Sequence, residues 1–185
     1  MPQTCIPYPA GEAVQLRPAG LDDGPFLLKV YASSREEELA VVPWTAEQKR
    51  LFLESQSRLQ EQHYRRQFPN AEYQIILHQG EAAGRFYISR EPGHFQLLDI
   101  TLLPQFRSLG LGSAILRNLL AEARKKGVTV GLHVLQNNRA EKLYQRLGFR
   151  RTGENGFYHQ MEWRADGEPP APADAIPKAS EETGS

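Results

Sequence analysis

A short stretch with two glycines, Pro104 to Ser113, has the residue types that bind an anionic group. It follows an apolar, strand-like segment, Leu97 to Leu103, and leads directly into a segment with helical periodicity. Gly110 and Gly112 lack a β-carbon, so the backbone can adopt positive φ and a ligand can approach it closely. The first turn of a helix has N–H groups without internal partners and carries partial positive charge. The stretch therefore predicts a cradle for a pyrophosphate, with Arg107 as a cation at its mouth.

Two other phosphate-binding motifs do not fit this turn. A P-loop requires a lysine directly after its last glycine, whereas Gly112 is followed by Ser113. The dinucleotide fingerprint requires a third glycine at the position that Ile115 occupies. A tight strand-to-helix turn without any ligand stays open as the alternative, because an isolated Gly-x-Gly sequence is a weak signal.

A second polar and aromatic segment, Asn137 to Phe149, follows the next expected strand, Val128 to Leu135. Its inward-facing residues recur at helical spacing: Ala140, Leu143, Tyr144 and Leu147. Asn137 or Asn138 would cap the start of this helix, and Gly148 would end it. On spacing alone, Tyr144 is a core aromatic residue rather than a catalyst.

Together the two segments resemble the signature motifs of the GNAT N-acetyltransferase superfamily. The Arg-x-x-Gly-x-Gly sequence from Arg107 is similar to its acyl-CoA motif, although Ser108 and Leu109 replace residues that are more common there. The Asn-x-x-Ala-x-x-x-Tyr-x-x-x-Gly-Phe sequence from Asn137 is similar to its second motif. The resemblance extends over about residues 14–163 and is most specific over residues 97–149.

The resemblance implies an α+β fold of the α/β/α type. Its central sheet would be mixed, mostly antiparallel and splayed, with about six or seven strands flanked by about four helices. Acetyl-CoA would lie as co-substrate between the strands Leu97–Leu103 and Val128–Leu135, and no metal is expected. The residues expected to contact it are Ile100, Thr101, Leu102, Arg107, Ser108, Leu109, Gly110, Leu111, Gly112, Ser113, Asn137 and Tyr144.

The activity implied by the resemblance is transfer of an acetyl group to a primary amine of a small molecule or a peptide, by direct attack in a ternary complex. Tyr144 would be the general acid that protonates the departing thiolate. An alkyl amine is protonated at neutral pH, so a base is also needed. Asp99, which shares a strand face with Thr101, and His133 on the adjoining strand are the candidate bases. A structural role stays open for both, and His159 and Glu162 are weaker candidates.

The acceptor amine is expected beside the segment between the first two helices, which the pattern places at Leu21 to about Ala32 and about Ala46 to Gln67. The acids Glu37 and Glu38 and the nearby Trp44 could attract a cationic amine through charge and cation–π contact. A solvated helix end is the alternative interpretation of these acids.

Composition is typical of one globular domain: 185 residues, 40% hydrophobic, 24% charged, with a formal net charge of zero. The expected organisation is an N-terminal extension over residues 1–12, the acetyltransferase domain over 13–164 and a disordered tail, rich in proline and acids, over 165–185. The single cysteine, Cys5, excludes an intrachain disulfide and fits a reducing cytoplasm. No signal peptide and no apolar run of about 18 residues is present, so neither secretion nor a membrane span is expected.

The partners expected are therefore acetyl-CoA and an amine acceptor. Charge is too balanced for a nucleic acid, and a homodimer is common in the superfamily. A different class of function stays open. The chain would then be a non-catalytic acyl-CoA-binding module for regulation or interaction, with its proline-rich tail recruiting a partner.

Overall fold

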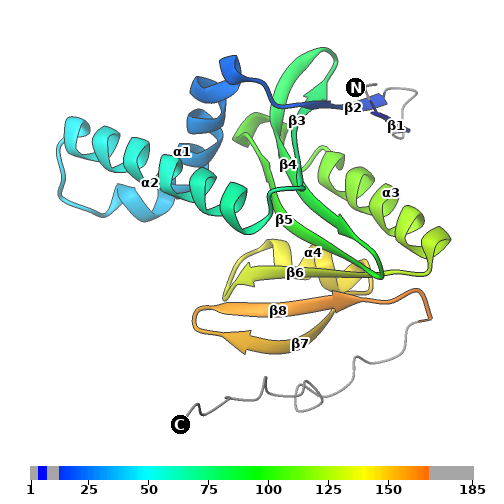
Figure 1. The fold of residues 1–185 in the computed structure, drawn as a ribbon. Coiled ribbons are helices and arrows are strands. Elements are labelled where there is room, and N and C mark those ends of the chain that lie inside the picture. The colour runs from blue at the N-terminus through cyan, green and yellow to red at the C-terminus, as the bar shows by residue number, and fades with distance from the viewer. Residues whose placement is uncertain (1–3, 8–12, 167–185) are drawn as a thin grey trace, which may run out of the picture.

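The computed structural model describes residues 4–7 and 13–166. They form one eight-stranded sheet in the order β1-β2-β3-β4-β5-β6-β8-β7, in which only the β5–β6 pair is parallel (Figure 1). The strands are β1 (Thr4–Pro7), β2 (Ala13–Pro18), β3 (Glu72–His78), β4 (Glu81–Glu91), β5 (His94–Leu102), β6 (Thr129–Leu135), β7 (Arg150–Asn155) and β8 (Tyr158–Trp163). The expected mixed α+β fold is confirmed.

The sheet has one strand more than the six or seven expected. The additional strand is β1, which falls within the expected N-terminal extension and pairs antiparallel with β2. Its Ile6 is only 2% exposed and joins the main core. Four residues with a single buried side chain are too few for a sequence pattern to indicate a strand. Most of the expected tail lies outside the described residues.

Helices cover both faces of the sheet (Figure 1). They are α1 (Gly24–Ala40) and α2 (Ala46–Gln67) on one face and α3 (Leu111–Lys126) and α4 (Ala140–Arg146) on the other. β4 shows this division, because Phe86 and Ile88 belong to the core cluster under α3, whereas Tyr87 belongs to the smaller cluster under α1. None of the described helices combines the length and apolar character needed to cross a membrane.

α1 continues about eight residues beyond the expected end at Ala32. The hydroxyls of Ser33 and Ser34 donate to the carbonyl oxygens of Val30 and Tyr31, so both serines fit within the helix instead of ending it. The segment with Glu37 and Glu38 is therefore the exposed end of α1, as the alternative interpretation has it, and its expected place between the first two helices is wrong.

The sheet splays where β5 and β6 part. These strands pair from His94 with Thr129 to Leu97 with Leu132, and their remaining residues have no partner across the gap. At the same point the register between β5 and β4 shifts by one residue, at Leu98. A bulge of this kind bends a strand and increases its twist. It also changes which side chains share a face, since Asp99 then lies opposite Tyr87.

Candidate active site

The glycine turn forms the strand, turn and helix start that the sequence predicts. Ser108 and Gly110 both have positive φ, 62° and 88°, and α3 starts at Leu111. The N–H group of Ala114 donates to the carbonyl of Gly110 at 3.0 Å and closes the first turn. Within the described chain, none of the six N–H groups from residue 108 to 113 donates to another backbone group. The turn therefore leaves a row of backbone donors for an anion.

Arg107 is turned away from this row. Its Nε donates to the carbonyl oxygen of Leu102 at 2.9 Å, and one terminal nitrogen donates to the carbonyl oxygen of Ser33 in α1 at 3.2 Å. Arg107 thus ties the turn to β5 and α1. The expected contact of its guanidinium with a pyrophosphate stays a prediction.

The free edge of β5 provides a second set of backbone groups. The N–H of Leu103 donates to Ala83 of β4 at 2.9 Å. Because main-chain groups alternate along a strand, those of Thr101 also face β4, whereas those of Ile100 and Leu102 face the gap that β6 leaves. Of the three residues expected to pair with the co-substrate, Ile100 and Leu102 therefore have the suitable orientation.

Tyr144 projects from α4 into the core and is 7% exposed, with its ring edge-on to Phe149 at 5.7 Å. Its hydroxyl has no hydrogen-bond partner in the described part of the chain and is not among the fully buried unpartnered atoms, so solvent or a ligand can reach it. Burial raises the pKa of this hydroxyl, and the negative charge of Asp99 raises the pKa further. Tyr144 is therefore a protonated donor, and it lies within electrostatic range of Asp99.

Asn137 and Asn138, which precede α4, have different roles. The side-chain oxygen of Asn138 accepts the N–H of Ala140 at 2.9 Å, so Asn138 is the residue that caps the helix. Asn137 has φ of 65° and is exposed, so its side chain is free to contact a ligand.

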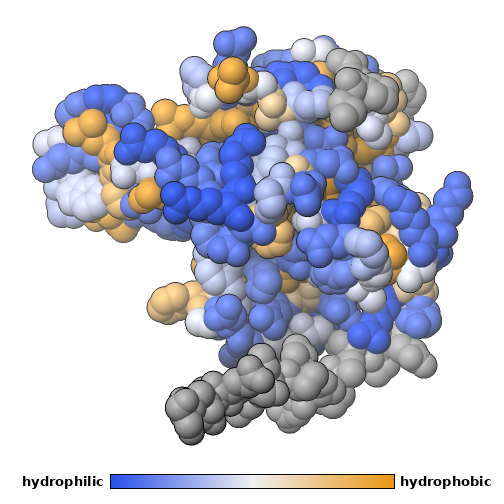
Figure 2. All heavy atoms as spheres, in the orientation of Figure 1, coloured by the Kyte–Doolittle hydropathy of each residue, from blue (hydrophilic) through white to orange (hydrophobic). Residues whose placement is uncertain are grey.

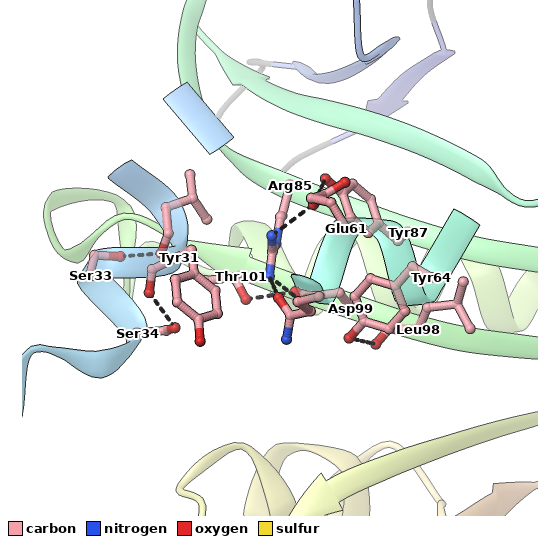
Figure 3. Close-up of polar contacts among 12 residues, drawn as sticks. Tyr31, Ser33, Ser34, Glu61, Tyr64, Arg85, Tyr87, Leu98, Asp99 and Thr101 are labelled. Atoms are coloured by element: carbon pink, nitrogen blue, oxygen red, sulfur yellow. Dashed lines mark hydrogen bonds and ion pairs between the residues drawn. The ribbon is translucent and has the colours of Figure 1, made fainter. Parts of the chain in front are cut away.

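Asp99 is held by two neighbours on its own face of the sheet. Its Oδ2 lies 2.6 Å from a terminal nitrogen of Arg85, and its Oδ1 accepts the hydroxyl of Thr101 at 2.7 Å. Asp99 and Thr101 share a face as expected, directly opposite Tyr87 and Arg85 of β4. Figure 3 shows Asp99 with Tyr64 from α2 on one side of it and Tyr31 from α1 on the other.

Arg85 links Asp99 to α2. The guanidinium also lies 3.1 Å from Oε1 of Glu61 (Figure 3). It donates as well to the side-chain oxygen of Gln60 at 2.8 Å. The hydroxyl of Tyr87 donates to the same Glu61 oxygen at 2.7 Å. Arg85 is 2% exposed. Burial alone would lower its pKa, but the charges of Asp99 and Glu61 raise the pKa and keep the guanidinium charged.

Sequence reasoning did not single out Arg85, Glu61 or Gln60. On a strand with alternating character, Arg85 reads as an outward-facing residue, and Glu61 is one of many charged residues on a polar helix. One weak feature of the sequence could have indicated that Arg85 faces the sheet's packed side. Tyr87 stands two residues after Arg85, so the two side chains project from the same face of the strand.

His133 lies on the same side of the sheet as Asp99. Its neighbours Leu132 and Val134 are buried under the α3–α4 layer, so His133 faces the opposite way and is exposed. Partial desolvation lowers its pKa. The weaker candidate His159 is instead buried beside Oε2 of Glu141 in α4, at 3.2 Å, and Glu162 pairs with Arg164 at 2.7 Å.

The residues expected at the acceptor site lie apart from the Asp99 cluster. Glu37 is exposed, Glu38 pairs with Arg35 at 3.0 Å, and Trp44 is 41% exposed and packs edge-on against Phe52. No hydrogen bond or ion pair joins Glu37, Glu38 or Trp44 to that cluster in residues 13–166. The outline of the molecule is indented between the α1–α2 pair and the β7–β8 turn (Figure 2).

No group of three or more metal-ligating side chains occurs among residues 4–7 and 13–166. The groups that the candidate site does contain are backbone donors, one largely buried phenol and an ion-paired carboxylate. A row of N–H groups at a helix start and an open strand edge suit an extended ligand with phosphates and amides.

Residues 35–149 match the acetyltransferase (GNAT) family, and the chain belongs to it. Members of this family use acetyl-CoA as the acyl donor. No curated protein matches the sequence significantly.

Solved structures share the fold at low identity. PaiA N-acetyltransferase from Thermoplasma acidophilum, in complex with coenzyme A, is 19% identical with a TM-score of 0.61, over 82% of this chain and 98% of that one. PH1933 from Pyrococcus horikoshii is 17% identical with a TM-score of 0.60, over 82% and 98%. A Salmonella typhimurium acetyltransferase that modifies the N-terminal serine of ribosomal protein L7/L12 is 20% identical with a TM-score of 0.55, over 86% and 96%.

Proposed function

We propose that the protein transfers the acetyl group of acetyl-CoA to a primary amine by direct attack in a ternary complex. The observation that carries this proposal is the unpartnered hydroxyl of the largely buried Tyr144, which lies within electrostatic range of Asp99 near the region where β5 and β6 part. A molecule that only bound acyl-CoA would need the glycine turn but neither of these groups. PaiA was solved with coenzyme A, and the Salmonella acetyltransferase modifies the N-terminal serine of a ribosomal protein, which supports both parts of the proposal.

The free backbone groups would hold the co-substrate along its length. The N–H groups from residue 108 to 113 suit the pyrophosphate, and the main-chain groups of Ile100 and the N–H of Leu102 suit the amides of the pantetheine arm, whereas the Leu102 carbonyl is held by Arg107. The exposed side chain of Asn137 lies at the opposite side of the gap, at the end of β6. This arrangement would place the thioester near Tyr144, where the strands separate.

The reaction needs three actions from this chain. His133 accepts a proton from the ammonium of the acceptor, and the amine nitrogen then forms a bond to the thioester carbon. The N–H of Ile100 donates to the carbonyl oxygen as that oxygen gains negative charge. When the carbon–sulfur bond breaks, the Tyr144 hydroxyl donates its proton to the thiolate, and the second proton that the attacking nitrogen loses returns to the Tyr144 phenolate through water. Asp99 supplies a fixed negative charge that attracts the cationic amine.

The function is tested by calorimetry and by release of free thiol from acetyl-CoA against a panel of amines. We expect acetyl-CoA to bind with a dissociation constant in the micromolar range and thiol release to require an amine. No binding near millimolar acetyl-CoA would refute the cofactor site. Binding without amine-dependent thiol release would instead favour a non-catalytic acyl-CoA-binding module.

The base is tested by the pH dependence of kcat/KM. Because desolvation lowers the pKa of His133, its neutral form persists to lower pH, and the ascending limb should have its midpoint below about 6.5. His133→Gln should remove this limb. Asp99→Asn should lower the rate and keep the limb, since both oxygens of Asp99 are already engaged. If Asp99→Asn removes the limb instead, Asp99 is the base.

The cytoplasmic location, the homodimer and the role of the tail stay predictions. So do the acceptor contacts of Glu37, Glu38 and Trp44. Tyr31 and Tyr64 lie on either side of Asp99 (Figure 3), and aromatic rings at this place would suit a cationic amine.

A further inference from the structure

One contact joins α2 to the point where the sheet splays. The hydroxyl of Tyr64 donates to the carbonyl oxygen of Leu98 at 3.2 Å, across 34 positions of sequence (Figure 3). The ring of Tyr64 is fixed edge-on against Tyr87 of β4 at 6.0 Å. The hydroxyl is therefore held at this position by packing and not only by its hydrogen bond.

Leu98 occupies an exceptional place in β5. It is the residue left without a partner by the register shift against β4, and it directly follows Leu97, the last residue paired with β6. The carbonyl of Leu98 thus lies at the irregularity of the β4–β5 ladder, where a bulge disrupts the regular pairing. Tyr64 supplies a donor to this carbonyl.

We propose that Tyr64 is a positioning residue, whose hydroxyl fixes the Leu98–Asp99 peptide and so aims the N–H of Ile100 at the carbonyl of the bound thioester. This inference rests on the proposed function. A peptide group is planar, so fixing its carbonyl oxygen limits the rotation of the backbone on both sides of it. Ile100 is the next residue whose N–H faces the gap, and its direction follows from that rotation.

The hydrogen bond also neutralises an unfavourable dipole. An unpartnered carbonyl oxygen of Leu98, at the edge of the gap, would repel the oxygen of the thioester as that oxygen becomes negative. Burial, and after it the charge of Asp99, raises the pKa of Tyr64, so its hydroxyl remains a donor over the working pH range. The contact is thus preorganised before the co-substrate binds.

The test compares two variants that each lose one hydroxyl. Tyr64→Phe removes the contact with Leu98. Tyr73→Phe is the matched control, because Tyr73 packs on the same Tyr87 ring at 4.9 Å and its hydroxyl also donates to a backbone carbonyl, that of Phe68 at 3.0 Å. We expect Tyr64→Phe to lower kcat about tenfold to a hundredfold, with KM for acetyl-CoA within about twofold. We expect Tyr73→Phe to leave both values unchanged.

A spectroscopic readout separates positioning from packing. The infrared band of a 13C-labelled acetyl carbonyl, bound to each variant as acetyl-CoA, reports how strongly that carbonyl is polarised. In Tyr64→Phe the band should move to higher frequency than in the wild type and in Tyr73→Phe. An unchanged kcat and band in Tyr64→Phe, or equal losses in both variants, would overturn the inference.

A third measurement separates this inference from the proposed function. Amide NMR of the unliganded protein follows the N–H groups of Asp99 and Ile100 directly. Tyr64→Phe should shift these two amide signals and speed their hydrogen exchange, whereas Tyr73→Phe should not. If the wild type transfers no acetyl group, the proposed function fails, and the amide signals alone decide whether Tyr64 fixes the bulge.

Discussion

Replacing Tyr144 with phenylalanine is expected to lower kcat about tenfold to a thousandfold and to leave the affinity for acetyl-CoA nearly intact. The substitution keeps the ring that packs against Phe149 and removes only the hydroxyl. That hydroxyl has no partner in the described chain, so its loss breaks no internal contact. The reason for the effect is that the departing thiolate then lacks a proton donor.

Two measurements accompany this variant. Calorimetry with acetyl-CoA should give the wild-type dissociation constant, and the thermal midpoint should stay close to the wild-type value. Because burial and Asp99 raise the pKa of Tyr144, the wild type should keep its proton donor in alkaline solution. A kcat equal to that of the wild type would reduce Tyr144 to a packing residue.

The second large effect is expected when the buried cation Arg85 is removed, which should lower the stability of the fold. Arg85→Met should lower the free energy of unfolding at neutral pH by about 3–5 kcal/mol, because it leaves the carboxylates of Asp99 and Glu61 in a largely buried site without their cation. Methionine preserves much of the side-chain length, so the loss is mainly electrostatic. Chemical denaturation of the wild type and the variant measures it.

Arg117→Met is the matched control, since Arg117 is exposed on α3 and forms no ion pair within residues 13–166. It should change stability by less than about 0.5 kcal/mol. Equal effects of the two substitutions would contradict a special role for the buried Arg85.

The local features of the fold were predictable from the sequence. A helix was expected directly after the glycine turn, and α3 begins there, with Gly110 and Gly127 in positive φ at its two ends, because glycine signals at helix ends act locally. The strand before the glycine turn and the short helix that carries Tyr144 were predicted for the same reason. The length of α1 was not predictable, because two consecutive serines usually disfavour a helix interior. In the structure, the hydroxyls of Ser33 and Ser34 donate to carbonyl oxygens of the preceding turn, and the helix continues.

The chemistry around Asp99 depends on contacts that are distant in sequence. Its partner Arg85 is 14 residues away on β4, and Tyr64, which lies on α2, reaches β5 across 34 positions. The bulge at Leu98 shifts the register by one residue, which a pattern of alternating residues does not indicate. The sequence therefore predicted Asp99 as a candidate and could not predict the cluster that holds it.

The central claim is that backbone donors at the glycine turn hold the pyrophosphate and thereby bring the thioester to Tyr144. A crystal structure of the complex with acetyl-CoA tests it most directly. We expect the pyrophosphate oxygens within hydrogen-bond distance of the N–H groups from residue 108 to 113, and the thioester sulfur within reach of the Tyr144 hydroxyl. A co-substrate bound elsewhere on the molecule, or a sulfur remote from Tyr144, would contradict the claim.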